Sequence, residues 1–309
     1  MGGVGKLEFS IGISSPFSLD YTLESGQAFR WENRGEWWYG VVGGGVIKAR
    51  QEGETLRLES SSERIDSGYV RSYFRTEENL STILASIDRD PTINGALQRY
   101  YGLRLIRQDF FECLASFVLA TNVNIPRIRK MIDSLCSKFG TPIQFEGLQY
   151  FSFPEPQTIA DSTTLELRAC GLGYRAPFLK KVAESIVHGE IDRSELSLKT
   201  YDEAQGLLLK RLSGMKVLPG VGPKVADCVL LFSCDQDEAF PIDIWIARAL
   251  STSYPAIFGR GNARKLSLAA YRGVSAAARG YFGSYAGYAQ QYLYMSAREK
   301  SMESQGLTT

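Results

Sequence analysis

One short segment constrains the fold and the chemistry of this chain more than any other. It reads LPGVGPKVADC at residues 218–228 and is followed by PID at residues 241–243. A Leu-Pro-Gly-Val-Gly turn is typical of the centre of a helix-hairpin-helix, where glycines let the backbone approach a nucleic-acid phosphate. We therefore expect a hairpin over residues 214–224 whose Gly220, Val221 and Gly222 contact a DNA phosphate. A helical turn without any ligand can also contain Pro-Gly.

Lys224 falls in the first turn of the helix that follows the hairpin. The helix dipole opposes a positive charge there and lowers the proton affinity of an amine, and partial burial acts in the same direction. A neutral amine is the form that nucleophilic attack requires. The alternative is a lysine that contacts a phosphate and performs no chemistry.

Asp243 directly precedes the apolar run Ile-Trp-Ile-Ala, which predicts that it caps the N-terminus of a helix. A capping carboxylate is held rigidly and can stabilise a positive charge that develops on a sugar. Lys224 and Asp243 are therefore a candidate nucleophile and its electrostatic partner. Together with the hairpin they indicate chemistry on DNA.

Composition narrows the class of protein. The chain has 309 residues, of which 44% are hydrophobic and 22% charged, as in a globular protein of two or three domains. No apolar run approaches the roughly 20 residues of a membrane span, and the N-terminus has no signal-peptide pattern. We expect an intracellular protein, in the cytoplasm or nucleoid of a prokaryote or the nucleus of a eukaryote.

Cysteine and histidine usage excludes several kinds of site. The five cysteines form neither a paired framework nor the tight clusters of an iron–sulfur site. His188 is the only histidine, which argues against a His-rich zinc site and against a Ser-His-Asp triad. We expect no catalytic metal.

Charge is unevenly distributed along the chain. The net charge is +1, yet residues 244–300 carry eight Lys or Arg and a single acid, Glu299. Such asymmetry is typical of a face that meets a polyanion, although the arginines can also be scattered over a solvated surface. No feature requires an oligomer, so we expect a monomer.

The hydrophobic pattern predicts an α+β fold. Residues 7–60 alternate aromatic and β-branched runs with glycine turns, which indicates an antiparallel meander. From residue 67 the period is helical, so we place a sheet domain with helices at 1–105 and a helical catalytic region at 106–309, with the last helix returning toward the sheet domain. The first expected helix contains Leu80 to Ile87 and is ended by Pro91. Further helices are expected at 113–120, 128–139, 165–172, 177–187, 197–212, 224–233, 244–250 and 285–298. Residues 140–142 stop the helix at 128–139, and residues 154–156 form a loop.

Seven motifs in order make the chain resemble one family. They are SGQAFRW (25–31), RLIRQD (104–109), NVNIPRI (122–128), GLGYRA (171–176), the hairpin-lysine motif (218–228), PID (241–243) and YAGYAQ (285–290). The chain thus resembles the 8-oxoguanine DNA glycosylases of the helix-hairpin-helix (HhH-GPD) superfamily, similar to the eukaryotic type. The resemblance implies that Lys224 attacks the deoxyribose C1′, expels 8-oxoguanine, forms a Schiff base and cleaves the strand by β-elimination, with Asp243 as partner. It implies base excision repair on duplex DNA without a cofactor, and a monovalent cation at the hairpin–phosphate contact remains an option.

The resemblance and the spacing together suggest a pocket for an extruded base. Cys228 lies one helical turn after Lys224, and Tyr294 one turn after Gln290. Tyr294 would stack on the purine and Gln290 would bond its Watson–Crick edge. Periodicity alone would make Cys228 and Tyr294 core residues. Gly26 matches the family position whose carbonyl accepts the N7–H that 8-oxoguanine has and guanine lacks.

The resemblance also implies recognition of the cytosine left opposite the lesion. Asn122, Arg127 and Arg175 match residues that hold this cytosine, and Tyr174 matches the wedge beside it. Taken singly, these side chains would most often lie on a solvated surface.

Three departures from the eukaryotic pattern stand out. Trp245 replaces a phosphate-contacting histidine, Tyr294 replaces a phenylalanine, and Val123 replaces an asparagine of the cytosine-side loop. Two other functions compete with the main hypothesis. A non-catalytic helix-hairpin-helix protein would leave the Lys224–Asp243 pair without a purpose, and a glycosylase for alkylated or other damaged bases would carry the aspartate without the lysine.

Overall fold

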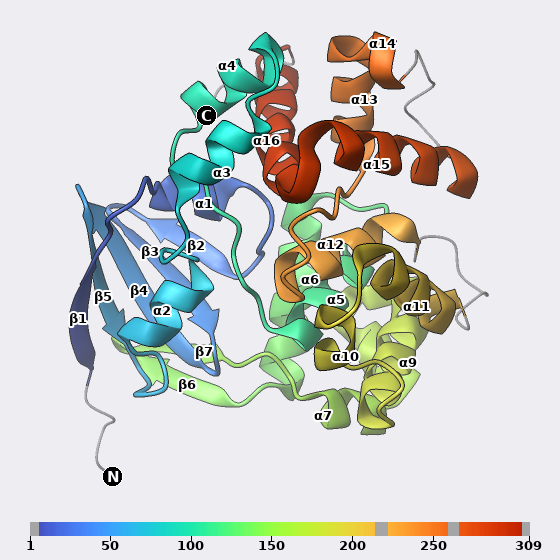
Figure 1. Ribbon diagram of the computed structural model, residues 1–309. Coiled ribbons are helices and arrows are strands. Elements are labelled where there is room, and N and C mark those ends of the chain that lie inside the picture. The colour runs from blue at the N-terminus through green and yellow to red at the C-terminus, as the bar shows by residue number, and fades with distance from the viewer. Residues whose placement is uncertain (1–5, 214–221, 259–265, 305–309) are drawn as a thin grey trace.

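The computed structural model describes residues 6–213, 222–258 and 266–304 (Figure 1). Within these ranges, no helix has the length and apolar character needed to cross a membrane. The predicted hairpin residues Gly220 and Val221 lie outside the described residues, whereas Gly222 lies inside them.

A five-stranded antiparallel sheet forms the N-terminal part of the fold. In space the strands lie in the order β1-β5-β4-β3-β2. The consecutive strands β2 to β5 form the predicted meander, and the N-terminal strand β1 pairs with β5. The turn between β3 and β4 has two glycines with positive φ, Gly43 and Gly44, a conformation that glycine adopts without steric cost. The strands are β1 (Leu7–Gly12), β2 (Trp31–Arg34), β3 (Trp37–Val42), β4 (Gly45–Glu52) and β5 (Thr55–Ser60).

Helices make up most of the remaining chain, which confirms the α+β class. Those before the central helix are α1 (Leu19–Glu24), α2 (Ser67–Tyr73), α3 (Leu80–Ile87) and α4 (Pro91–Arg99). The middle of the chain forms α5 (Phe110–Leu119), α6 (Ile125–Phe139), α7 (Pro156–Asp161), α8 (Thr164–Leu167), α9 (Ala176–Val187), α10 (Arg193–Ser197) and α11 (Tyr201–Ser213). The rest contributes α12 (Pro223–Ser233), α13 (Ile244–Ser253), α14 (Pro255–Phe258), α15 (Leu268–Phe282) and α16 (Ala286–Ser304).

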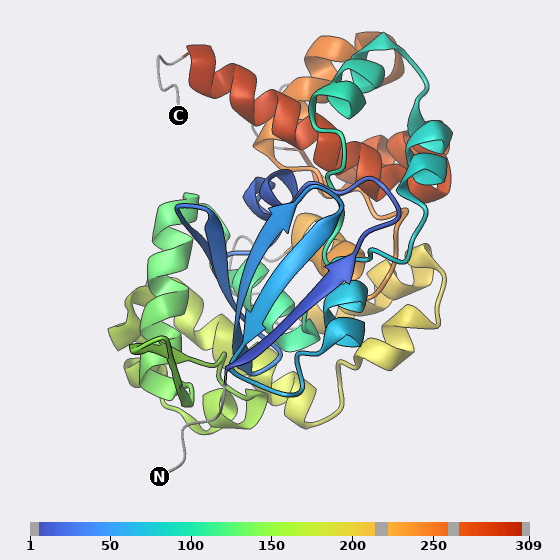
Figure 2. The same cartoon turned by 90° about the vertical axis from the view of Figure 1, so that its left-hand side faces the viewer.

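The helices gather into two groups beside the sheet (Figures 1 and 2). One group holds α5 to α12, and the other holds α3, α4 and α13 to α16. Helices α3 and α4 pack against α16 rather than on the sheet, so segments from both ends of the chain share one group. Gln291 and Arg298 of α16 also donate to the carbonyls of Ser25 and Glu24 beside the sheet.

The described core centres on α5 and α12. The α5 residues Cys113, Leu114 and Ala115 are wholly buried, in agreement with the predicted apolar central helix. The ring of Phe117 on α5 stacks on that of Phe232 on α12, with 5.6 Å between centroids. This packing places the first turn of α12, and with it Lys224, beside the end of α5.

Several local expectations are wrong. Pro91 begins helix α4, capped by Asp90, rather than simply ending α3, and Pro156 likewise begins α7, because the fixed φ of proline suits a first helical turn. The segment after Gly140 forms a hairpin of strands β6 (Pro142–Phe145) and β7 (Leu148–Phe151), which the sequence analysis does not predict.

Two further differences concern helices. The helix expected at 197–212 is two helices, α10 and α11, because Thr200 begins a new turn. Its backbone N–H and hydroxyl donate to the Glu203 carboxylate, 3.1 and 2.8 Å away. Helix α15 is not predicted, because two of the four side chains that it buries at helical spacing, Ser275 and Ala278, are polar or small and do not mark an apolar stripe.

Gly287 allows α16 to pack closely on α12. A Cβ at this position would lie 2.2 Å from Leu231 Cδ1 and 2.8 Å from the Asp237 carbonyl oxygen. We expect Gly287→Ala to lower the free energy of unfolding by about 3 kcal/mol, because overpacking forces backbone shifts. Urea unfolding, followed by circular dichroism, measures this change in the free energy of unfolding. Gly280→Ala on α15, where a Cβ meets no atom within 4 Å, is the matched control, and equal stability of both variants would contradict the packing argument.

Candidate active site

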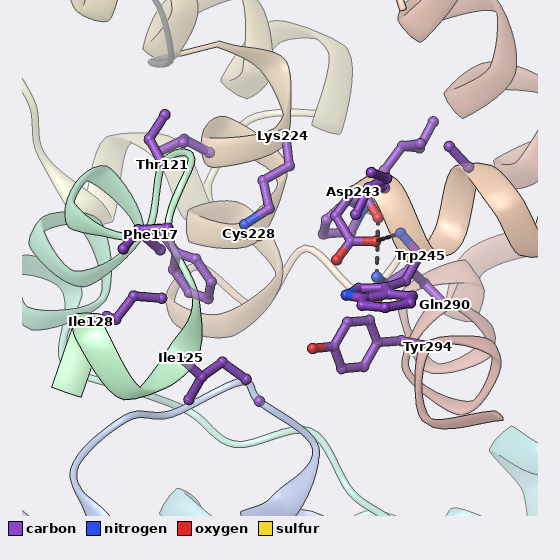
Figure 3. Close-up of a pocket in the computed structure, with 18 of the residues that line it drawn as sticks. Phe117, Thr121, Ile125, Ile128, Lys224, Cys228, Asp243, Trp245, Gln290 and Tyr294 are labelled. Carbon is purple, nitrogen blue, oxygen red and sulfur yellow. Dashed lines mark hydrogen bonds between the residues drawn. The ribbon is translucent and has the colours of Figure 1, made fainter. Parts of the chain in front are cut away.

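A cavity of about 880 Å³ is lined by residues from both helical groups. Its walls come from distant parts of the chain: the turn at Ser25 and Gly26, the end of α5 with the loop at 120–124, the starts of α6 and α12, the segment 241–247, Tyr271 of α15, and α16. Figure 3 shows Lys224 and Phe117 on one side of this cavity and Asp243, Gln290 and Tyr294 on the other.

Lys224 reaches the cavity from the first turn of α12. Gly222 caps this helix, and its carbonyl oxygen accepts from the N–H groups of Val225 and Ala226. The Lys224 ammonium nitrogen lies 4.8 Å from the centroid of the Phe117 ring, and its side chain points toward Cys228 (Figure 3). The amine is half-buried and lines the cavity, as a nucleophile acting on a bound substrate requires.

Asp243 caps α13, which confirms the N-cap interpretation. Its Oδ1 accepts from the backbone N–H groups of Trp245 and Ile246, at 2.9 and 2.8 Å. Burial raises the pKa of Asp243 above its usual 3.8, while these donors and the charge of Lys224 act in the opposite direction. The carboxylate is therefore rigid, poorly solvated and electrostatically coupled to Lys224 across the cavity (Figure 3).

Cys228 is a thiol beside Lys224. The side chain is 3% exposed, and burial raises its pKa to about 12, although its hydrogen bond with Lys224 and the charge of that lysine lower it. It is therefore protonated at neutral pH and contributes an uncharged wall.

Gln290 presents an unsatisfied acceptor. Its Nε2 donates to the carbonyl oxygen of Pro241 at 3.0 Å, which fixes the orientation of the amide, because a carbonyl accepts only from the nitrogen. Its Oε1 is buried and has no hydrogen-bond partner among the described residues. A buried acceptor left unpaired costs about 1–3 kcal/mol, so a bound donor would satisfy it at a clear gain.

Gly26 and Tyr294 meet at the edge of the same cavity. Gly26 has φ +74°, and a Cβ there would lie 3.2 Å from the Tyr294 hydroxyl oxygen. This hydroxyl points into the cavity (Figure 3). The structure thus brings together all six residues predicted for catalysis and base binding, since the cavity lining includes Lys224, Asp243, Gly26, Cys228, Gln290 and Tyr294. Their individual roles remain predictions.

Three of the four residues predicted to face the opposite cytosine gather around Thr121. Arg175 is buried, donates to the Thr121 carbonyl from Nε and Nη2, and lies 4.4 Å from the Tyr174 ring centroid. Tyr174 is 42% exposed, as a wedge would be. Asn122 lies next in the chain at the cavity wall with φ +54°, a conformation that costs a non-glycine residue energy. Arg127 is the exception, because it lies exposed in the first turn of α6 and outside the cavity lining.

Other residues of the site are not predicted from the sequence. Phe117 and Tyr271 line the cavity, and Trp245, noted only as a departure from the family, lines it as well. Asp227 lies outside the cavity lining but bonds to Tyr271. It can be recognised in the sequence, because a single charge inside the apolar run Val225–Phe232 predicts a buried, partnered group. Across the described residues, no three His, Cys, Asp or Glu side chains cluster as metal ligands would.

Comparisons with known proteins identify the two parts of the fold. Residues 10–114 match the model of the 8-oxoguanine DNA glycosylase N-terminal domain, and residues 115–257 match that of the HhH-GPD superfamily base excision DNA repair proteins. The chain is 30% identical to a probable N-glycosylase/DNA lyase of Methanothermobacter thermautotrophicus, over 93% of this chain and 95% of that protein. It is also 30% identical to an N-glycosylase/DNA lyase of Arabidopsis thaliana, over 90% and 77% of the two chains.

A solved structure agrees with both matches. The 8-oxoguanine glycosylase/lyase of Clostridium acetobutylicum, in complex with double-stranded DNA containing cytosine opposite 8-oxoguanine, superposes with a TM-score of 0.81 at 29% identity. The alignment covers 95% of this chain and 98% of that one. With a cavity that holds Lys224 at the start of α12 and the capping Asp243, the chain belongs to the 8-oxoguanine DNA glycosylase type of the HhH-GPD superfamily.

Proposed function

We propose that this protein excises 8-oxoguanine from duplex DNA and then cleaves the strand, with Lys224 as the nucleophile and Asp243 as its electrostatic partner. The observation that carries the proposal is that both side chains line one cavity together with the unpaired acceptor of Gln290. Relatives that align with nearly the whole of this chain are named N-glycosylase/DNA lyase. Strand cleavage needs an amine, which the aspartate alone would not supply.

We infer the following reaction from the placement of Lys224 and Asp243 in one cavity. The lone pair of the Lys224 amine attacks C1′ of the deoxyribose, the bond from C1′ to the base breaks, and the base leaves with the electron pair and gains a proton. The sugar ring opens to a Schiff base with the lysine. Loss of a C2′ proton then expels the 3′ phosphate by β-elimination. Asp243 is held rigidly by its two backbone donors and would stabilise the positive charge that develops on the sugar as the glycosidic bond breaks.

Base selection would use the opposite wall. The free Oε1 of Gln290 suits an N–H donor of the guanine Watson–Crick edge, and Tyr294 supplies a ring for stacking. The carbonyl of Gly26 would accept N7–H, which 8-oxoguanine carries and guanine replaces by an acceptor. Arg175 and Asn122 would bind the opposite cytosine, whose O2 and N3 accept hydrogen bonds.

We propose that the chemistry requires no cofactor, because lysine and aspartate supply both the nucleophile and the charge. A monovalent cation at the hairpin remains a proposal, since Gly220 and Val221 lie outside the described residues. We also propose that the protein acts as a monomer. Such an enzyme would act where genomic DNA lies, in the nucleoid of a prokaryote or the nucleus of a eukaryote.

The direct test offers the protein four duplexes, which contain 8-oxoguanine opposite cytosine, 8-oxoguanine opposite adenine, guanine opposite cytosine, or 3-methyladenine opposite thymine. Mass spectrometry detects the free base and gel electrophoresis the cut strand. We expect release and cleavage chiefly with 8-oxoguanine opposite cytosine. Release of 3-methyladenine alone, or of no base, would overturn the proposed function, and equal rates opposite adenine would reject the cytosine preference.

A further inference from the structure

A buried carboxylate lies three residues after Lys224 on the same helix. Asp227 is wholly buried in α12. Its Oδ1 accepts from the Tyr201 hydroxyl at 2.7 Å and from Gln205 Nε2 at 2.6 Å, both on α11. Its Oδ2 accepts from the Tyr271 hydroxyl of α15 at 2.6 Å. These three donors are neutral, and the charge of Arg279 also favours the ionised carboxylate.

Tyr271 continues this chain of hydrogen bonds to the segment that carries Asp243. Its hydroxyl donates to Asp227 and accepts from the backbone N–H of Ile242 at 3.1 Å. The preceding carbonyl, that of Pro241, is fixed separately by Gln290. The peptide group between Pro241 and Ile242 is thus held at both its carbonyl and its N–H by buried side chains, one residue before Asp243.

Stability alone does not explain this arrangement. Burying a carboxylate is costly, and a well-packed apolar replacement is often as stable or more stable. Burial raises the pKa of Asp227 to about 6, although the hydrogen bonds from Tyr271, Gln205 and Tyr201 lower it. A charge retained at such a cost, and connected through Tyr271 to the segment of Asp243, indicates a role in the site.

We infer that Asp227 and Tyr271 are positioning residues, which hold the 241–243 segment against the helix of Lys224 and so set the spacing between the Lys224 amine and the Asp243 carboxylate. This inference rests on the proposed function. Tyr271 contacts the backbone beside Asp243, so its contribution to the reaction should pass through that carboxylate.

A double-mutant cycle tests this dependence. We expect Tyr271→Phe to slow single-turnover excision of 8-oxoguanine about 10- to 100-fold, because small displacements of reacting groups are costly. The dissociation constant for the lesion duplex should change less than about 3-fold, since the hydroxyl that is removed bonds Asp227 and the Ile242 backbone. In the Asp243→Asn background the same change should cost less than about 3-fold, because the carboxylate it positions is already gone.

Tyr201→Phe is the matched control. Tyr201 donates to the same carboxylate from the far side, and its described hydrogen bonds reach Asp227, Gln205 and Ser275 but not the 241–243 segment. We expect it to lower the melting temperature and leave the excision rate within about 2-fold of wild type. Should Tyr271→Phe fail to fold, Asp227→Asn, which leaves one acceptor oxygen for the three donors, enters the same cycle.

The outcomes separate the two proposals. The positioning role would be overturned if Tyr271→Phe lowered the excision rate by the same factor in the wild-type and the Asp243→Asn backgrounds. It would also be overturned if Tyr201→Phe lowered the rate as much as Tyr271→Phe. In either case the network would act only through general stability. A wild-type protein that releases no 8-oxoguanine would instead contradict the proposed function.

Discussion

Lys224→Gln should lower the single-turnover rate of 8-oxoguanine release by on the order of 10³-fold or more, because the variant lacks the amine that attacks C1′. Glutamine keeps a polar side chain of similar length, and α12 is anchored by its buried face rather than by this position. Binding of the lesion duplex should therefore persist. Rates are measured by quantifying free base over time with enzyme in excess.

Lys181→Gln provides the control for this variant. Lys181 lies on α9, its side chain is 48% exposed, and it is absent from the cavity lining. The same loss of a positive charge there should leave the rate unchanged. If both variants excise 8-oxoguanine at the wild-type rate, Lys224 is not the nucleophile.

Asp243→Asn should slow excision by about 10²- to 10³-fold, the range found when a preorganised electrostatic group is removed. Asparagine is also a good N-cap, so α13 should keep its first turn and the effect should report the lost charge. Single-turnover rates and binding constants measured together distinguish slower chemistry from weaker binding. An unchanged rate would reject the electrostatic role.

The pH dependence gives a second readout of Asp243. Burial raises its pKa above 3.8, and the ionised form is the active one, so the excision rate should fall as pH drops through this raised pKa. The acid limb should therefore lie above pH 3.8 in the wild type and vanish in Asp243→Asn. Asp66→Asn, the same change at the exposed cap of α2, is the control and should alter neither rate nor profile.

Local sequence patterns predict the parts of the site that depend on neighbouring residues. Glycine spacing places Lys224 in the first turn of α12, and the apolar run after Asp243 predicts its cap. The meander of the sheet follows in the same way from alternation and glycine turns. These features are encoded within a few residues of one another.

Contacts between distant segments are harder to predict. The bond from Tyr271 to Asp227 joins residues 44 positions apart, and Tyr271 lies on a helix whose buried face includes the polar Ser275 and the small Ala278. The β6–β7 hairpin is short, and it is held against the main sheet by the bond from Lys48 to Glu146. Tertiary packing decides such elements, so neither propensity nor periodicity predicts them.

The central claim is that the Lys224 amine bonds to the sugar, and borohydride trapping tests it most directly. The protein is incubated with a duplex containing 8-oxoguanine opposite cytosine, reduced, digested and analysed by peptide mass spectrometry. A reduced Schiff base should appear on the peptide that contains Lys224 and should be absent from Lys224→Gln. An adduct on another residue, or one that persists in Lys224→Gln, would contradict the account.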